Sequence, residues 1–218
     1  MNELTLIQRI AVWLLPVLFA ITIHEVAHGW VARKCGDNTA WMLGRLTLNP
    51  LKHIDPVGTI LIPGLLLVTG TGFIFGWAKP VPVNFRNLKN PKQDMAIVAA
   101  AGPFSNLLMA LGWALGIRLG ILVNQESITL PLVYMGIAGI SINLVLALIN
   151  LLPIPPLDGS RIVSGILSAK WAWYYNRFEP YGFYLLLVLL ATGMLGEILG
   201  YPMAVAQLIF FKIAGLEV

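Results

Sequence analysis

Long apolar blocks alternate with short polar links through most of this chain, and they restrict it to folds that suit a lipid bilayer. The blocks cover residues 4–31, 57–77, 95–123, 130–152 and 181–213. A helix needs about 20 apolar residues to cross the hydrocarbon core, and a lone spanning segment must be helical because its backbone finds no water partners there. With 58% hydrophobic and 11% charged residues, against about 25% charged in soluble domains, the chain is predicted to be an all-α polytopic membrane protein with about five to six transmembrane helices.

Two of the blocks do not resemble regular spans. The block at 57–77 is rich in glycine and interrupted by Pro63, which favours a re-entrant segment whose backbone is covered by protein. The block at 181–213 is broken around residues 193–202, so it could be one tilted helix or a hairpin of two. The links at 36–56 and 78–91 mix β-formers with prolines, which suits extended edge strands. We therefore expect a re-entrant segment and a small membrane-associated β-sheet beside the helices.

The whole chain, 1–218, is expected to form one membrane-embedded domain, because no polar stretch is long enough for a separate soluble one. Its expected parts are a helix at 4–34, a β and re-entrant region at 36–93, helices at 95–123 and 130–152, a loop at 150–160, and C-terminal helices at 160–215. The net charge of +4 arises from scattered basic residues and predicts no nucleic-acid partner. The single cysteine, Cys35, cannot form an intramolecular disulfide.

The first block contains His24-Glu25-Val26-Ala27-His28. Two histidines four positions apart lie about one turn apart on a helix, so both imidazoles can reach one metal ion. Glu25, beside the first histidine, could take a proton from the attacking water, as in other HExxH sites. Each ionisable group at membrane depth costs about 2.5 kcal/mol or more. Three of them within five residues therefore indicate a metal site in preference to a chance match or a polar cluster.

A catalytic zinc needs a third protein ligand and an open position for water. Asp158 stands out because the prolines of Asn150-Leu-Leu-Pro-Ile-Pro-Pro-Leu-Asp158-Gly159 end the preceding helix and carry the carboxylate on extended backbone. An N-cap for the next helix is the alternative role for Asp158. The other candidate ligands are His53, Asp37, Asp55, Asp94, Glu126 and Glu179, and a thiolate from Cys35 is a further option.

The pairing of HEVAHG with NLLPIPPLDG resembles the site-2 protease family of intramembrane zinc metalloproteases, in particular its compact prokaryotic group without a PDZ module. The similarity continues through residues 49–58, 76–84 and 101–106. The resemblance implies one zinc ion held by His24, His28 and Asp158, with Glu25 as general acid and base and Asn150 near the scissile carbonyl. It also implies that 36–56 and 76–84 form a membrane-inserted sheet whose edge pairs with an unwound substrate.

Topology and charge give a prediction that does not depend on the family. His24 and Asp158 can share a metal only if the chain between them crosses the membrane an even number of times. The loops on their side then hold Arg33, Lys34, Arg45, Lys52, Lys79, Arg86, Lys89, Lys92, Arg161, Lys170 and Arg177, and the other side holds Arg9, Arg118 and Lys212. This asymmetry predicts that the active-site end faces the cytoplasm and that the N-terminus lies outside, and the resemblance implies that the membrane is a prokaryotic inner membrane.

The predicted function is hydrolysis of peptide bonds within or near transmembrane segments, with a membrane protein or peptide bound in extended form in the bilayer as substrate. A catalytically silent membrane interaction protein and a metal transporter are the alternatives. His53 and Asn106 are interpreted as residues that support the site or orient the substrate, with helix packing as the alternative for Asn106. The aromatic residues Trp171, Trp173, Tyr174 and Tyr175 are interpreted as an interfacial belt.

Overall fold

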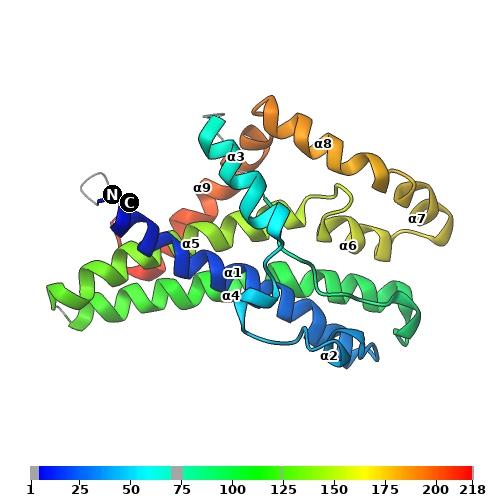
Figure 1. The fold of residues 1–218 in the computed structure, drawn as a ribbon, viewed down its shortest axis with the longest axis horizontal. Coiled ribbons are helices and arrows are strands. Elements are labelled where there is room, and N and C mark those ends of the chain that lie inside the picture. Colours follow the sequence, from blue (N-terminus) through cyan, green and yellow to red (C-terminus); the bar gives the residue numbers. More distant parts are fainter. Residues whose placement is uncertain (1–4, 70–75, 124, 218) are drawn as a thin grey trace.

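The computed structural model describes residues 5–69, 76–123 and 125–217, and long helices dominate it. Within that part of the chain, length and composition allow four helices to cross a membrane. These are α1 (Leu6–Lys34), α4 (Pro91–Val123), α5 (Glu126–Leu151) and α9 (Met194–Ala214). Figure 1 shows α1, α4 and α5 side by side along the long axis of the molecule. The protein is therefore a multi-pass membrane protein of the all-helical class.

Helix α1 has well-defined signals at both ends. Thr5 caps its N-terminus in a capping box with Gln8, in which each side chain bonds the other's backbone N–H. Arg33 and Lys34 occupy the last turn, where cations interact favourably with the helix dipole. The helix therefore runs unbroken from Thr5 to the basic loop, and its middle carries the HEVAH motif.

Small residues allow α4 and α5 to pack closely. A Cβ atom on Gly136 would lie 2.3 Å from Ile117, and one on Gly139 would lie 2.5 Å from the Trp113 ring. Glycine at such contacts is typical of helix packing in membranes, where close approach and van der Waals contact drive association. The C-terminal helix α9 completes this core, because Ala214 belongs to the same buried cluster as Ile117.

The block at 181–213 forms two helices, α8 (Glu179–Ala191) and α9, and not one tilted span. Gly193 separates them in the left-handed conformation, with φ of 77°, which ends α8 in a way that glycine adopts at little cost. With 13 residues, α8 is shorter than the roughly 20 that a crossing requires. The expected five to six spans are thus four helices of spanning length in the described chain, plus shorter apolar helices.

The expected β-sheet is absent from the described residues. Residues 36–56 instead contain helix α2 (Thr39–Met42) and the short turn η1 (Pro50–Lys52). Residues 77–84 are extended but have no strand partner there, because Pro80 and Pro82 lack the N–H groups that a ladder needs. Isolated contacts bond this backbone instead: Arg45 donates to the carbonyls of Lys79 and Pro80, and the N–H of Lys79 donates to the carbonyl of His53.

The described ends of the glycine-rich block lie against each other. Trp77 donates its N–H to the carbonyl of Gly58 at 3.0 Å, and Thr59 donates its hydroxyl to the carbonyl of Trp77 at 2.8 Å. Between them the chain forms η2 (Pro56–Leu61) and α3 (Ile62–Thr69), and residues 70–75 lie outside the described part. The first and last residues of the block at 57–77 therefore lie close together. This is the arrangement expected of a re-entrant segment, which enters and leaves the membrane on the same side.

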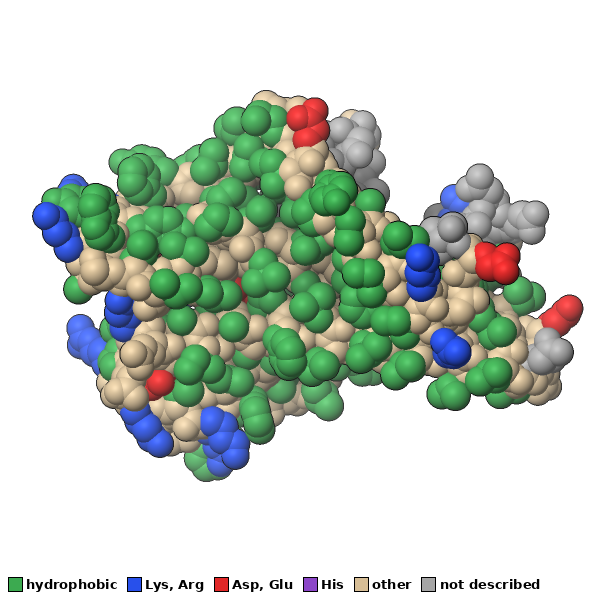
Figure 2. All heavy atoms as spheres, turned by 180° about the vertical axis from the view of Figure 1, so that it is seen from behind, with side chains coloured by type: hydrophobic (Ala, Val, Ile, Leu, Met, Phe, Trp, Pro, Cys, Tyr) green, Lys and Arg blue, Asp and Glu red, His purple; other side chains and the backbone are tan. Residues whose placement is uncertain are grey.

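Short elements surround the long helices. The 3-10 turn η3 (Phe85–Asn87) leads into α4. After α5 the chain continues through the proline-rich link into α6 (Asp158–Ile166) and α7 (Ala169–Asn176). Figure 2 shows that Lys and Arg side chains gather at one end of the molecule, with few at the other.

Asp37 joins the loop after α1 to the loop before α4. Its carboxylate is fully buried and accepts the N–H groups of Thr39 at 3.0 Å and Asn84 at 2.6 Å, and an amide N–H of Asn87 at 3.0 Å. Burial alone would raise the pKa of Asp37, but the hydrogen bonds from Thr39, Asn87 and Asn84 outweigh it and lower the pKa below its usual value. Asp37 is therefore a structural anchor for the 77–84 segment and not a metal ligand.

We expect Asp37→Asn to lower the free energy of unfolding by about 1–3 kcal/mol, because an amide cannot accept all these bonds. Since folding lowers this pKa, the carboxylate stabilises the protein above its unfolded pKa of about 3.9, and the benefit is lost as pH falls through the folded value. Melting curves in detergent should show the same gap between wild type and variant at pH 7 and pH 5. A gap that closes already at pH 5 would contradict this account.

Candidate metal centre

His24 and His28 project from consecutive turns of α1 toward α4. Both side chains are buried, and their Nε2 atoms are 3.0 Å apart with the rings edge to face. The four-residue spacing thus places two imidazole nitrogens at one point, at the depth where α1, α4 and α5 pack together.

Asp158 brings the third ligand atom to the same point. Its Oδ2 lies 3.3 Å from Nε2 of His24 and 3.2 Å from Nε2 of His28. The proline-rich link after α5 carries it there, and Asp158 is the first residue of α6. Leu157 occupies the N-cap position of that helix. The structure therefore places the Asp158 carboxylate with the two histidines. Asp158 is not the N-cap of α6, which was the alternative role considered for it.

Nε2 of His24, Nε2 of His28 and Oδ2 of Asp158 lie close together, and each presents a lone pair to the other two. The Nδ1 atom of His28 lies 2.7 Å from the carbonyl of Val98, which can only accept, so Nδ1 carries the proton and Nε2 of the neutral ring does not. Nδ1 of His24 is bonded likewise to Oδ1 of Asn106 at 2.5 Å. The buried Oδ2 of Asp158 accepts no hydrogen bond from the part of the chain that the structure describes. Such a convergence of acceptors is unfavourable without a cation between them.

The separations suit zinc. Tetrahedral zinc binds imidazole nitrogen and carboxylate oxygen at about 2.0–2.1 Å, which places neighbouring ligand atoms about 3.3 Å apart. The observed separations are 3.0, 3.2 and 3.3 Å. Two histidines and one carboxylate also match the donor set of catalytic zinc sites, which leave a fourth position for water.

Gly102 on α4 makes room for the two imidazoles. A Cβ atom at this position would lie 2.3 Å from Nε2 of His28 and 2.6 Å from Cε1 of His24. Neither ring can retreat easily, since each is bonded on its far side. The two imidazole rings therefore occupy the space that a side chain at Gly102 would need, a role that the sequence alone did not assign to this glycine.

We expect Gly102→Ala to weaken zinc binding by about 10- to 100-fold, the range seen when groups supporting metal ligands are changed. Gly116→Ala on the same helix is the matched control, because a Cβ there meets no atom within 4 Å. Zinc affinity measured by competition with a chelator should fall in the first variant and stay unchanged in the second. Equal affinity in both would remove Gly102 from the site.

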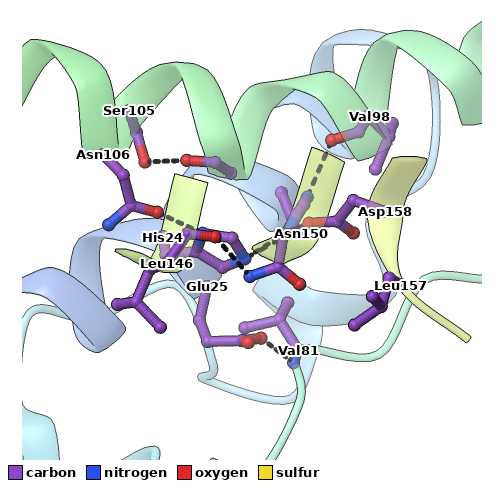
Figure 3. Close-up of polar contacts among 12 residues, drawn as sticks. His24, Glu25, Val81, Val98, Ser105, Asn106, Leu146, Asn150, Leu157 and Asp158 are labelled. Carbon is purple, nitrogen blue, oxygen red and sulfur yellow. Dashed lines mark hydrogen bonds and ion pairs between the residues drawn. The ribbon is translucent and has the colours of Figure 1, made fainter. Parts of the chain in front are cut away.

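Glu25 lies beside the three ligands in a cavity of about 310 Å³, which Asn150, Val81 and Arg161 also line. Its Oε2 accepts the backbone N–H of Val81 at 2.7 Å. Figure 3 shows Glu25 below His24, bonded to Val81 of the extended segment. A carboxylate in this position can accept a proton from a water in the cavity.

Asn150 on the last turn of α5 reaches the same cavity, and Figure 3 shows its amide between Asp158 and Glu25. Its Nδ2 donates to the carbonyl of Leu146 at 2.9 Å. An amide NH₂ has two hydrogens, so this bond uses one of them. The group is therefore placed to act as a donor inside the cavity.

Asn106 contacts one of the clustered histidines, whereas His53 contacts loop residues. Asn106 is buried on α4 and bonded to His24. His53 is buried in the loop before η2, where its ring bonds the carbonyl of Thr47 and its own carbonyl accepts the N–H of Lys79 at 2.9 Å. His53 therefore holds the extended segment and is not among the three clustered ligands of the described chain.

The remaining ligand candidates serve other local contacts. Asp55 caps η2, and Asp94 accepts the N–H of Asn90. Glu179 pairs with Arg161, and Glu126 lies in the first turn of α5. Cys35 follows the end of α1, and burial raises the pKa of its thiol. None of these residues joins the metal cluster found in the described part of the chain.

Comparison with known proteins supports a metal-dependent peptidase. The model of peptidase family M50 matches residues 119–193, which include Asn150 and Asp158. The Bacillus subtilis protein named "Putative zinc metalloprotease YwhC" is 43% identical over 195 residues, covering 87% of this chain and 84% of its own. Rip2 of Mycolicibacterium smegmatis, with the same descriptive name, is 30% identical over 181 residues, covering 83% of this chain and 66% of its own.

A more distant relative is the regulator of sigma-E protease RseP of Salmonella typhimurium. It is 29% identical over 113 residues, which cover 50% of this chain and 25% of that protein. No solved structure matches the chain. The similarity to YwhC extends over most of both chains.

Proposed function

Since this chain belongs to peptidase family M50 and is an intramembrane zinc metalloprotease, we propose that His24, His28 and Asp158 hold its zinc ion and that Glu25 and Asn150 carry out peptide hydrolysis beside it. The observation that carries this assignment is the convergence of three acceptor atoms within 3.3 Å of one another. Among the described residues, Oδ2 of Asp158 has no hydrogen-bond partner, and the carboxylate of Glu25 lies in the same cavity.

The chemistry divides between the metal and the chain. Bound zinc supplies a Lewis acid that lowers the pKa of water and polarises a carbonyl. Glu25 accepts the proton of the attacking water at its carboxylate and later passes it to the leaving amine. Asn150 donates an amide N–H to the oxygen of the scissile carbonyl as negative charge develops on it. His24 and His28 are buried, so the interactions beside them are stronger than they would be in bulk water.

The substrates are membrane proteins, and we propose that they bind in extended form along residues 77–84. A helix hides its scissile carbonyl in internal hydrogen bonds, so a transmembrane substrate must unwind before attack. Residues 80, 81 and 83 line the cavity on extended backbone. A substrate strand laid beside this segment would bond the backbone groups that Arg45, Glu25 and Asp37 leave open, a partial form of the pairing in strand-addition complexes.

We also propose that the entire chain acts as one domain in the prokaryotic inner membrane, with the zinc site toward the cytoplasm. The loops that adjoin α1, α4 and α6 at the site end carry most of the basic residues, in line with the gathering of Lys and Arg in Figure 2. Loops rich in Lys and Arg stay on the cytoplasmic side during membrane insertion.

Cys35, the only cysteine, allows a direct test of this orientation. It is partly exposed at the site end of α1, and its raised thiol pKa calls for labelling in mildly alkaline buffer. A membrane-impermeant maleimide should label it in inverted vesicles and not in spheroplasts. In a Cys35→Ser background, Ser127→Cys at the exposed start of α5 should show the opposite pattern. Labelling of Cys35 from outside would reverse the proposed orientation.

The cleavage reaction is tested with the purified protein in liposomes that contain a single-span substrate. Mass spectrometry of the products should locate the cut inside the transmembrane segment, within its cytoplasmic half. The same segment with prolines removed, which makes its helix harder to unwind, should be cut more slowly. Products cut only in the soluble part of the substrate would contradict the proposal.

A further inference from the structure

Two asparagines lie fully buried between α4 and α5, and the chemistry above uses neither side chain directly. Asn106 and Asn143 each have no solvent exposure. Polar groups are costly in an apolar interior unless they are fully hydrogen-bonded, and those at membrane depth commonly mark function. The contacts of Asn143 therefore need an explanation.

A chain of hydrogen bonds runs from α5 to the metal site. Nδ2 of Asn143 donates to the carbonyl of Gly139 at 2.8 Å, one turn earlier on α5. Oδ1 of Asn143 accepts Nδ2 of Asn106 at 2.8 Å. Oδ1 of Asn106 then lies 2.5 Å from Nδ1 of His24. Each asparagine uses its nitrogen on one side and its oxygen on the other.

The direction of this chain follows from its backbone ends. The carbonyl of Gly139 can only accept, so it must face the NH₂ of Asn143, which turns the oxygen of Asn143 toward Asn106. The NH₂ of Asn106 then faces that oxygen and the carbonyl of Ala20, 3.3 Å away. The oxygen of Asn106 is left facing His24, which must supply the proton from Nδ1. The Nε2 lone pair of His24 thereby points to the metal site.

We propose that Asn143 is a positioning residue for the zinc site: by fixing the amide of Asn106, it holds His24 in the tautomer that can bind zinc. This rests on the proposed role of His24 as a ligand. Without Asn143, the NH₂ of Asn106 loses its shorter contact, at 2.8 Å, and keeps the longer one to the carbonyl of Ala20, at 3.3 Å. The amide can then turn over more readily and offer its NH₂ to Nδ1 of His24. That arrangement favours a proton on Nε2, and a protonated Nε2 cannot bind a metal.

The test compares Asn143→Leu with Leu144→Ala in full-length protein in detergent. Leu144 is the next residue on α5 and equally buried, but it belongs to the apolar core with Ile117 and Ala214. Both variants should melt at a lower temperature. Zinc affinity, measured by chelator competition, should fall about 10- to 100-fold in Asn143→Leu and less than about threefold in Leu144→Ala, whose contacts do not reach the ligands.

Zinc affinity within threefold of wild type in Asn143→Leu would overturn the inference, as would an equal loss in both variants, which would indicate general destabilisation. Should Asn143→Leu not fold, ¹⁵N NMR of histidine-labelled wild type decides the question. His24 is expected to carry its proton on Nδ1 without zinc, and a proton on Nε2 would overturn the inference. Failure of wild type to bind zinc would instead refute the proposed metal site itself.

Discussion

Glu25→Gln is expected to retain zinc and to lower the cleavage rate by about 10²- to 10⁴-fold, the usual contribution of a general acid or base. Glutamine has nearly the same shape as glutamate, and its side-chain oxygen can still accept the N–H of Val81 that Oε2 accepts at 2.7 Å. The variant should therefore keep the cavity intact while it loses the group that receives and returns the proton. Cleavage of a membrane-anchored substrate and bound zinc are measured on the same preparation.

Glu126→Gln is the matched control for this change. Glu126 is exposed in the first turn of α5, at the opposite end of that helix from Asn150. The control changes net charge equally and should leave the cleavage rate unaltered. Cleavage by Glu25→Gln at the rate of the control would remove Glu25 from the reaction.

Asp158→Asn should reduce zinc affinity by at least about 10²-fold, since a site of three protein ligands derives a large part of its binding free energy from each. The amide oxygen is neutral and a weaker ligand for zinc than a carboxylate, whose charge also offsets that of the cation. Cleavage should disappear at zinc concentrations that saturate wild type. Titration against a chelator of known affinity gives the binding constant.

Asp94→Asn offers the corresponding control. Asp94 is a buried carboxylate on α4 that accepts the N–H of Asn90 at 2.7 Å, away from the three clustered ligands. This variant should melt earlier but bind zinc as wild type does. Unchanged zinc affinity in Asp158→Asn would show that the third ligand lies elsewhere.

Local geometry in the sequence predicts the pair His24 and His28, whereas Asp158 was one of several candidate third ligands until the resemblance to the site-2 protease family singled it out. A four-residue spacing within an apolar helix places His24 and His28 on one face whatever the rest of the fold does. The cluster of three prolines at 153, 155 and 156 favours a helix end before it, and α5 ends at Leu151. The pairing of the two elements, however, depends on how α1, α4 and α5 pack, and only the structure shows it.

The β-sheet was wrongly predicted because strand-like composition does not specify a partner. Residues 77–84 are extended, as their prolines favour, but side chains of Arg45, Glu25 and Asp37 occupy their backbone groups. These contacts join positions far apart in the chain, and periodicity carries no information about them. The two-helix form of block 181–213 similarly depended on the left-handed conformation of Gly193.

The supporting residues of the site were hardest to infer. The importance of Gly102 comes from the two rings that occupy the space of its missing side chain, and their position is visible only in the structure. Asn143 gave no signal, because an isolated asparagine in an apolar helix has many possible partners. Its role becomes visible only when its contact with Asn106 is known.

The central claim is that one zinc ion lies among His24, His28 and Asp158. Anomalous scattering collected at the zinc edge from crystals of the zinc-loaded protein tests it most directly. The account predicts one strong peak about 2.0–2.2 Å from Nε2 of both histidines and from a carboxylate oxygen of Asp158. A zinc peak at His53, or one bound by the two histidines without Asp158, would contradict it.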